Sequence, residues 1–207
     1  MARRDFDGRA PDSFPLYAAG AMERLPTRLP GLILLAPAVH GDARGFFVET
    51  YRADAWAAAG VPTAFVQDNH SRSRRGTLRG IHFQTHPGQG KLVRVARGRV
   101  LDVVVDLRRG SPTFGEWEGV ELDDERGLQL YIPVGFGHGF CVLSDTADFV
   151  YKCTAYYDAA TESGIRFDDP EVGVRWPDGV ELLCSERDRG APLLADVADS
   201  LPFRYDG

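Results

Sequence analysis

Leu78-Arg79-Gly80-Ile81-His82-Phe83-Gln84 is a largely apolar segment with a histidine and a glutamine two residues apart. Its composition predicts a strand, and side chains two apart on a strand share a face. His82 and Gln84 should therefore lie on one face, with Ile81 and Phe83 on the other. Burying unpaired polar groups is costly. The polar face must then either be satisfied within a core or line a pocket, and the rest of the chain favours a pocket.

Short runs of strand-like sequence extend outward from this stretch in both directions. Clusters of Gly, Pro, Asp and Ser separate them, which is typical of an all-β sandwich or barrel. Residues 53–59 form the one persuasive short helix, stopped by Gly60 and Pro62, and a helical turn is expected near 185–189. The predicted strands are 32–35, 46–51, 63–69, 78–84, 92–96, 100–107, 117–122, 128–132, 139–143 and 148–156.

Length and composition favour one domain. The chain has 207 residues, 43% of them hydrophobic, and no internal repeat or long linker. We expect residues 1–21 to be an N-terminal extension and residues 22–207 to be a single domain. No apolar run is long enough for a membrane span, and the N-terminus lacks the apolar segment of a signal peptide. The three cysteines show no metal-binding spacing, so reduced thiols in a cytoplasmic protein are expected.

The net charge of −6 argues against nucleic acid as a general partner. Cations nevertheless cluster locally, and two interpretations stay open. The cluster is either a solvated, charge-mixed surface or part of a site for a small anion such as a diphosphate, which arginine side chains suit geometrically. Its members are Arg72, Arg74, Arg75, Arg79, Lys91, Arg94, Arg97 and Arg99.

Residues 100–107 alternate in a way that bears on the pocket. The residues at 101, 103, 105 and 107 are apolar and share a face, whereas Asp102 and Asp106 lie on the opposite face. Both carboxylates could face solvent. Asp102 has apolar neighbours on both sides, which leaves a pocket-lining role open.

Pro133-Val134-Gly135-Phe136-Gly137-His138-Gly139-Phe140 predicts a tight turn that carries a histidine into an apolar strand. Its Pro-x-Gly-x-x-His spacing resembles the second motif of the cupins, a jelly-roll superfamily. The first cupin motif normally supplies His-x-His and a glutamate, but here it reads His82-Phe83-Gln84 with no suitable glutamate before Gly98. Two histidines and an amide are a poor catalytic metal site. We therefore expect no metal and two imidazoles available for proton transfer.

Eight segments, in order along the chain, resemble the dTDP-4-dehydrorhamnose 3,5-epimerase family of metal-free cupin-type enzymes. Together they lie within about residues 30 to 190, so the resemblance covers most of the chain rather than a single short motif. They are 41–50, 65–71, 78–84, 90–94, 111–115, 132–140, 151–157 and 185–188.

The resemblance implies an all-β, cupin-type jelly-roll (double-stranded β-helix) barrel with a few short helices. It also implies a homodimer that acts on a dTDP-sugar without a cofactor. It places His82 on the general base, Asp188 on the carboxylate that orients it, Tyr151 on the general acid and Lys91 on the cation that stabilises an enolate. Substrate contacts are implied for Arg44, Glu49, Gln67, Asn69, Arg79, His138, Tyr157, Glu162 and Arg187. Arg187 stands where the family usually has lysine.

These residue types suit epimerisation next to a ketone. A C4 ketone acidifies the hydrogens on C3 and C5, so inversion needs a base on one face, an acid on the other, and a cation at the developing oxyanion. A C3-only or C5-only epimerase, a non-catalytic sugar-binding cupin and a metal-dependent cupin dioxygenase are the alternatives. Strict alternation from His82 would put Arg79 on the wrong face for ligand, so a contact there requires a bulge or twist before Gly80.

Overall fold

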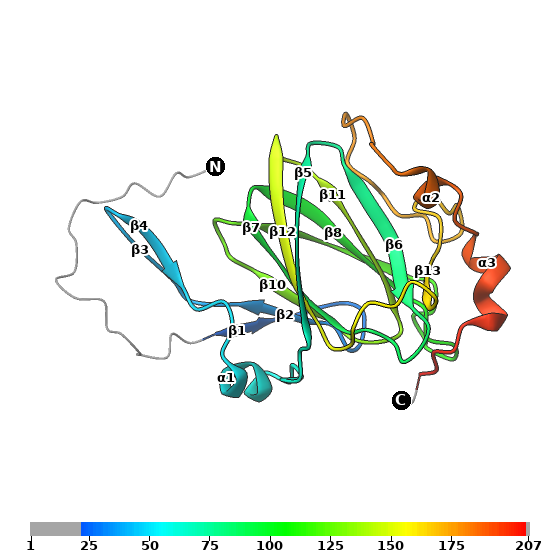
Figure 1. Ribbon diagram of the computed structural model, residues 1–207, viewed down its shortest axis with the longest axis horizontal. Helices are drawn as coiled ribbons and strands as arrows, with labels where there is room; N and C mark the ends of the chain where they lie inside the picture. The colour runs from blue at the N-terminus through cyan, green and yellow to red at the C-terminus, as the bar shows by residue number, and fades with distance from the viewer. Residues whose placement is uncertain (1–21, 206–207) are drawn as a thin grey trace.

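The structure is a computed structural model that describes residues 22–205. Two antiparallel sheets form a barrel (Figure 1), and the predicted N-terminal extension lies outside the described residues. The six-stranded sheet has the order β1 (Glu23–Leu25), β2 (Ile33–Ala36), β10 (Gln129–Ile132), β7 (Lys91–Arg97), β12 (Thr146–Cys153), β5 (Gln67–Arg74). The five-stranded sheet has the order β13 (Glu162–Gly164), β6 (Leu78–Gln84), β11 (Phe136–Val142), β8 (Arg99–Asp106), β9 (Trp117–Asp123). The remaining elements are β3 (Val39–Asp42), β4 (Gly45–Val48), α1 (Ala53–Ala58), α2 (Glu186–Arg189), α3 (Leu194–Val197) and a 3₁₀ turn, Ala198–Ser200.

The main core lies between the two sheets. Val93, Leu130 and Phe149 of the six-stranded sheet pack with Val104 and Phe140 of the five-stranded sheet. The rings of Phe140 and Phe149 stack with centroids 4.2 Å apart. Burial of these apolar faces against each other drives the two sheets together. Phe140 and Phe149 of this core also line the cavity described below.

Each sheet also has a covered outer face. Ile81 and Phe83 of β6 pack outward against the C-terminal residues Leu194, Leu201 and Phe203, which confirms the predicted alternation of β6. On the other sheet, α1 packs its Trp56 over the outer face. His82, on the opposite face of β6, therefore points into the space between the sheets.

A register shift places Arg79 on the pocket side of β6. His138 pairs with His82, whereas Phe140 pairs with Arg79, so β6 has one residue more than β11 between these pairs. Such a bulge moves the following side chains to the opposite face. Gly80 makes it possible, because a Cβ at this position would lie 2.4 Å from the Gly139 Cα. The irregularity that a ligand contact at Arg79 would require is therefore present, but it lies between Arg79 and His82 rather than before Gly80.

The strand predicted over residues 63–69 is wrong in its position. β5 begins at Gln67 and continues to Arg74, through the polar sequence Gln-Asp-Asn-His-Ser-Arg-Ser-Arg. It forms because it pairs along its whole length with β12. An edge strand with one solvated face can be polar, and apolar periodicity does not detect it.

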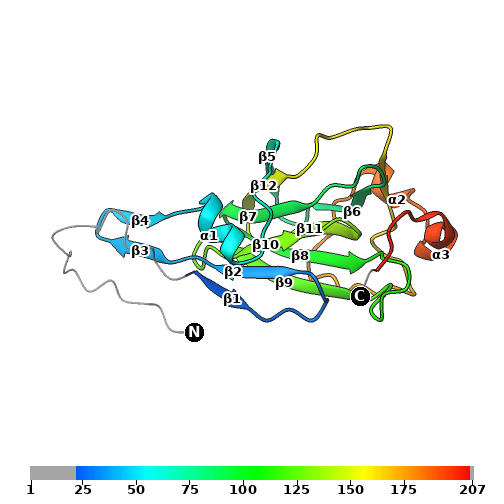
Figure 2. The same cartoon turned by 90° about the horizontal axis from the view of Figure 1, so that it is seen from below.

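The hairpin of β3 and β4 projects away from both sheets (Figures 1 and 2). Phe46 and Phe47 on β4 are each 60% exposed. Two neighbouring exposed phenylalanines on a projecting hairpin are typical of a surface that contacts another protein.

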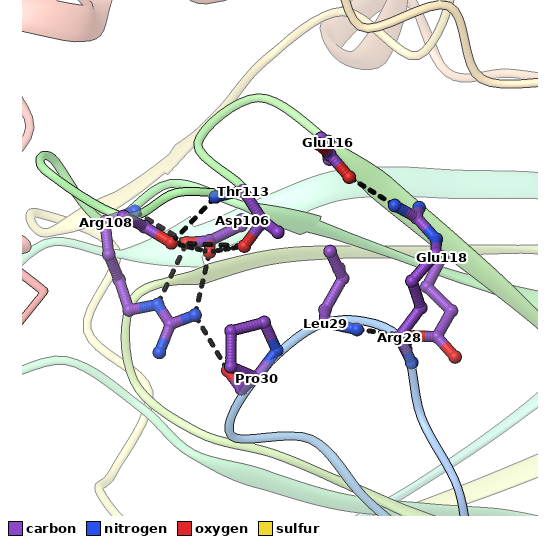
Figure 3. A network of polar contacts seen from close by, with 9 residues as sticks. Arg28, Leu29, Pro30, Asp106, Arg108, Thr113, Glu116 and Glu118 are labelled. Carbon is purple, nitrogen blue, oxygen red and sulfur yellow. Dashed lines mark hydrogen bonds and ion pairs between the residues drawn. The ribbon is translucent and has the colours of Figure 1, made fainter. Parts of the chain in front are cut away.

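A buried polar network fastens the end of β8 to the segment before β2 (Figure 3). Asp106 accepts hydrogen bonds from Arg108 and from the hydroxyls of Ser111 and Thr113. Arg108 also donates to the Pro30 carbonyl at 2.8 Å, and its guanidinium lies 4.2 Å from the centroid of the Phe136 ring. Asp106 thus has a structural role, and it lies outside the cavity lining.

Candidate active site

A cavity of about 410 Å³ opens between the two sheets. This volume is within the usual range for small-molecule sites. Both sheets and the segment around α2 contribute to it. Its lining consists of Ser71, Thr77, Leu78, Arg79, His82, Lys91, His138, Phe140, Phe149, Tyr151, Leu183, Ser185, Arg187 and Asp188.

His82 and Asp188 form a close polar contact between two residues of the cavity lining. The His82 Nε2 lies 2.7 Å from the Asp188 Oδ1, and the Gly80 N–H donates to the other carboxylate oxygen at 3.5 Å. Asp188 is buried, and Ser185 caps α2 by accepting from the Asp188 N–H. Burial alone would raise the pKa of Asp188, but the hydrogen bond and charge of His82 outweigh it and hold the pKa below its ordinary value. An ionised carboxylate behind Nε2 leaves Nδ1 as the ring nitrogen that can accept a proton.

A second histidine–carboxylate pair lies on the neighbouring strands. His138 pairs directly with His82 across β11 and β6, and its Nε2 lies 2.8 Å from the Asp102 Oδ2. The His138 ring stacks on Phe149. Burial raises the pKa of Asp102, against the opposing effects of His138 and Lys91. Asp102 itself does not line the cavity: it is fully buried and contacts His138, which does line it.

Lys91 and Tyr151 come from the six-stranded sheet, on the wall opposite the histidines. Burial lowers the pKa of Lys91, although Cys153, Glu162 and Asp102 partly offset the effect. Burial also raises the pKa of Tyr151, and the nearby Cys153 and Glu162 add to the shift. Tyr151 is therefore a protonated phenol at neutral pH and able to donate a proton.

Tyr157, Glu162 and Arg187 form a linked group at the rim. Arg187 lines the cavity, and its guanidinium lies 2.6 Å from the Glu162 Oε2. The Tyr157 hydroxyl donates to the same carboxylate oxygen at 2.8 Å. Burial alone would raise the pKa of Glu162, but Tyr157 and Arg187 together hold it below its ordinary value. The guanidinium at this position makes an ion pair where the family's usual lysine would present a single ammonium.

The remaining predicted site residues lie outside the cavity lining. Gln67 and Asn69 are on β5, where the Gln67 amide donates to the Asn69 side chain and Asn69 donates to the Cys153 sulfur. Arg44 lies in the turn of the β3–β4 hairpin beside Asp42, and Glu49 directly follows β4. Arg44 is therefore on the hairpin that projects from the barrel, and neither residue is in the cavity lining.

Of the predicted arginine cluster, only Arg79 lines the cavity. Arg72 instead pairs with Asp148 at the surface, with distances of 2.7 and 2.8 Å to the two carboxylate oxygens. Arg74 and Arg75 are exposed. Arg72, Arg74 and Arg75 therefore belong to the solvated, charge-mixed surface, which was the first of the two interpretations of the cation cluster. Lys91, another member of the predicted cation cluster, lines the cavity with Arg79, and Arg187 is a third cation there.

The sequence did not indicate Ser73, which contacts the cavity-lining Arg79. Its hydroxyl lies 3.3 and 3.2 Å from the Arg79 Nε and Nη2. Ser73 is inside a polar run that gave no strand signal, so nothing indicated that it would be buried. Residue alternation along β5 would have found it once that strand was known.

Within residues 22–205, no group of three or more His, Cys, Asp or Glu side chains is arranged to hold a metal. The three cysteines are free. Over the same described range, no helix has the length and apolar character of a membrane span. The expectation that the chain works without a metal or organic cofactor stays a prediction.

Comparison with known proteins gives consistent matches over most of the chain. A family model described as dTDP-4-dehydrorhamnose 3,5-epimerase matches residues 26–196. An enzyme of that name from Pseudomonas aeruginosa is 52% identical over 175 residues, which are 84% of this chain and 96% of the relative. Another from Neisseria gonorrhoeae is 51% identical over 180 residues, which are 86% of this chain, and the match spans 55% of that relative's length.

One relative carries a narrower name. A dTDP-4-dehydrorhamnose 3-epimerase from Streptomyces niveus is 46% identical over 181 residues, 86% of this chain and 87% of the relative. Among solved structures, dTDP-6-deoxy-D-glucose-3,5-epimerase from Legionella pneumophila in complex with dTDP-4-keto-L-rhamnose has 46% identity and a TM-score of 0.87. That match covers 90% of this chain and 100% of the other, so the predicted cupin-type jelly-roll fold is confirmed. The chain belongs to the dTDP-4-dehydrorhamnose 3,5-epimerase family.

Proposed function

We propose that the protein is a cofactor-free isomerase that inverts C3 and C5 of a dTDP-4-keto-6-deoxyhexose, as in the biosynthesis of dTDP-rhamnose or a related deoxysugar. One observation carries this reaction. The candidate base, His82, and the candidate acid, Tyr151, line the same cavity from opposite sheets. A sugar ring held between the sheets would have one group on each face, which is what abstraction and reprotonation with inversion require.

His82 removes the proton next to the ketone. Asp188 holds the ring with Nε2 toward the carboxylate, so that Nδ1 carries the free lone pair. The same carboxylate stabilises the imidazolium after proton transfer, as in other histidine–aspartate pairs. Positioned proton transfer of this kind contributes about 10²–10⁴-fold to the rate.

Lys91 stabilises the enolate oxygen that develops from the ketone. It is partly buried, and a cation in a site of low polarity stabilises a developing anion more strongly than it would in water. His138 and Arg79, which also line the cavity, bind the sugar and its oxygens. Tyr151 then delivers a proton from the other sheet.

Incubation with dTDP-4-keto-6-deoxyglucose in deuterated water tests the reaction. Deuterium at both C3 and C5, with product of the inverted configuration, is the expected result. Deuterium at one carbon alone would establish the C3-only or C5-only alternative, which the Streptomyces niveus relative makes concrete. No exchange at either carbon, with intact binding of dTDP, would instead establish a non-catalytic sugar-binding protein.

We infer that the active form is a homodimer in which the β3–β4 hairpin reaches the partner's site. Arg44 and Glu49 are implied substrate contacts, yet Arg44 lies in the turn of the projecting hairpin, Glu49 directly follows the hairpin, and neither lines its own chain's cavity. The exposed Phe46 and Phe47 would be covered in such an assembly. Each site would then combine one chain's barrel with the other chain's hairpin.

Mixing two inactive variants tests this arrangement. In a mixed dimer of Arg44→Ala and His82→Ala subunits, one site has an intact His82 and receives an intact Arg44 from the partner. Activity should return on mixing toward about a quarter of the wild-type value, because half of the dimers are mixed and each has one good site. If activity does not recover although mass spectrometry detects mixed dimers, Arg44 acts in the site of its own chain.

We further propose that residues 22–207 act as one domain in the cytoplasm. The free cysteines suit a reducing compartment. A chain starting at Met22 should keep its melting temperature and its kcat, and loss of either would assign a role to residues 1–21.

A further inference from the structure

Three glutamines converge on the loop that leaves β12. The Gln89 side chain donates to the Ala155 carbonyl at 2.8 Å, and the Gln67 side chain accepts from the Tyr157 N–H at 2.9 Å. Gln84 uses both ends of its amide: it donates to the Tyr156 carbonyl at 3.3 Å and accepts from the Asp158 N–H at 3.1 Å. Four consecutive loop residues, 155–158, thus have a backbone group bound by a glutamine side chain. We call Gln67, Gln84 and Gln89 the glutamine clamp.

The glutamine clamp binds the loop that connects the two sheets. β12 belongs to the six-stranded sheet and β13 to the five-stranded sheet, so the chain must leave one wall of the cavity and join the other. Gln67 lies on the first sheet and Gln84 on the second. Gln84 is only 4% exposed, and directly opposite it in the β13–β6 pairing is Glu162.

The loop carries an exposed aromatic to the rim of the cavity. Tyr157 is 51% exposed, and its hydroxyl meets the same Glu162 oxygen as Arg187, which lines the cavity. A continuous series of contacts therefore connects the buried Gln84, through the loop, to Tyr157, Glu162 and Arg187. An exposed aromatic ring next to a guanidinium suits a nucleoside diphosphate, because the ring can stack on a base and the cation can pair with phosphate.

We propose that Gln84 is a positioning residue for the nucleoside diphosphate end of the substrate, acting through Tyr157, and that it takes no part in the proton transfers. This rests on the proposed function for the identity of the substrate. Gln84 shares a strand face with His82, two residues away, but both ends of its amide bond to the loop. An amide can donate to the Tyr156 carbonyl and accept from the Asp158 N–H simultaneously, which an ionised carboxylate at this position could not do.

Gln84→Met tests the clamp, since methionine keeps the length and removes both hydrogen bonds. The Kd for dTDP, measured by calorimetry, and the KM for the sugar nucleotide should each rise at least tenfold, while kcat changes less than threefold. Leu201→Ala is the control for a purely structural effect, because Leu201 is buried among the C-terminal residues on the outer face of the five-stranded sheet. It should lower the melting temperature and leave the Kd for dTDP unchanged.

A double-mutant cycle tests whether Gln84 acts through Tyr157. Tyr157→Ala alone should weaken dTDP binding, and adding Gln84→Met should change the Kd less than twofold further, because the ring that Gln84 positions is gone. A full tenfold additional loss in the Tyr157→Ala background would overturn the proposal. So would wild-type dTDP affinity in Gln84→Met, or a loss confined to kcat.

The dTDP measurement requires no turnover. Absence of deuterium exchange in the wild-type protein would therefore remove the proposed reaction, and the clamp would still stand or fall on the Kd values alone.

Discussion

Replacing Asp188 by asparagine should disable His82 more severely than removing the side chain altogether. The Gly80 N–H donates to the Asp188 Oδ2, whereas Oδ1 faces the His82 Nε2. In Asp188→Asn, the asparagine carbonyl takes the position that faces the Gly80 N–H, because an amide NH₂ there would oppose another donor. The NH₂ then points at Nε2 and donates to it. That hydrogen bond moves the ring proton to Nδ1, so the nitrogen that should accept the substrate proton has no free lone pair.

The expected loss follows from the tautomer. An asparagine in the equivalent place behind a catalytic histidine lowers kcat by about 10⁴ through the same error, which corresponds to about 5.5 kcal/mol in the activation free energy. Here the contact of 3.5 Å from Gly80 is long, so selection of the wrong orientation is weaker and we expect a loss of about 10³–10⁴. Asp188→Ala leaves Nε2 without a partner and does not force either tautomer. Its loss should be smaller, about 10².

Rates of deuterium incorporation at C3 and C5, with kcat from product formation, measure both variants. The Kd for dTDP should remain within threefold of the wild-type value, since the nucleotide end does not contact Asp188 in this arrangement. Asp168→Asn is the charge-matched control: Asp168 also makes an ion pair, with Arg166, but at the surface. Equal activity in Asp188→Asn and wild-type protein, or a greater loss in Asp188→Ala than in Asp188→Asn, would refute the tautomer argument.

Tyr151→Phe should remove the acid but not the base, so we expect kcat to fall by about 10²–10⁴ while recovered substrate still gains deuterium without inversion; a substrate free of deuterium would contradict the assignment. Gly164→Ala should lower both the melting temperature and kcat, since its Cβ would lie 2.7 Å from the Ile81 carbonyl oxygen and 3.4 Å from the His82 ring, and wild-type kcat would show that the ring has room to move. Asp106→Asn should lower the free energy of unfolding by about 1–3 kcal/mol at pH 7 in urea titrations. Burial alone would raise the pKa of Asp106, but its hydrogen bonds to Arg108 and neighbouring hydroxyls hold it below its ordinary value. The ionised carboxylate therefore stabilises the fold above its unfolded pKa of about 3.9, and that stability is lost as pH falls through the folded pKa. Wild-type and variant stabilities should accordingly converge below about pH 4, and a constant difference from pH 7 to pH 3 would contradict this account.

The local pattern of apolar and polar residues was sufficient to predict much of the barrel, including which side chains share a strand face. The alternation of β6 predicted that Ile81 and Phe83 face away from His82, and both pack in the outer cluster. It also predicted that Val103 and Asp102 lie on opposite faces of β8, as they do. These predictions depend only on the two-residue repeat of a strand, which holds wherever a strand has one apolar face.

The contacts that make the site are of another kind. His82 and Asp188 are 106 positions apart, and β5 forms from a polar run because β12 offers it hydrogen bonds. Neither residue spacing nor hydropathy contains such information. Resemblance to a family indicated Asp188 and Arg187 by position, but not that Arg187 pairs with Glu162. That ion pair depends on how the loop after β12 and the segment around α2 meet at the rim.

Strand β6 shows how one short element can serve stability and chemistry together. The side chains that pack the outer cluster leave it on one face, so the apolar burial that holds the strand does not compete with the cavity. On the other face, the two-residue repeat directs His82 to the cavity and Gln84 to the loop after β12. The bulge at Gly80 adds Arg79 to that face, where a regular strand would have turned it away. Because the bulge requires a glycine against the backbone of Gly139, the close approach of β6 and β11 determines that His82 and Arg79 share one wall of the cavity.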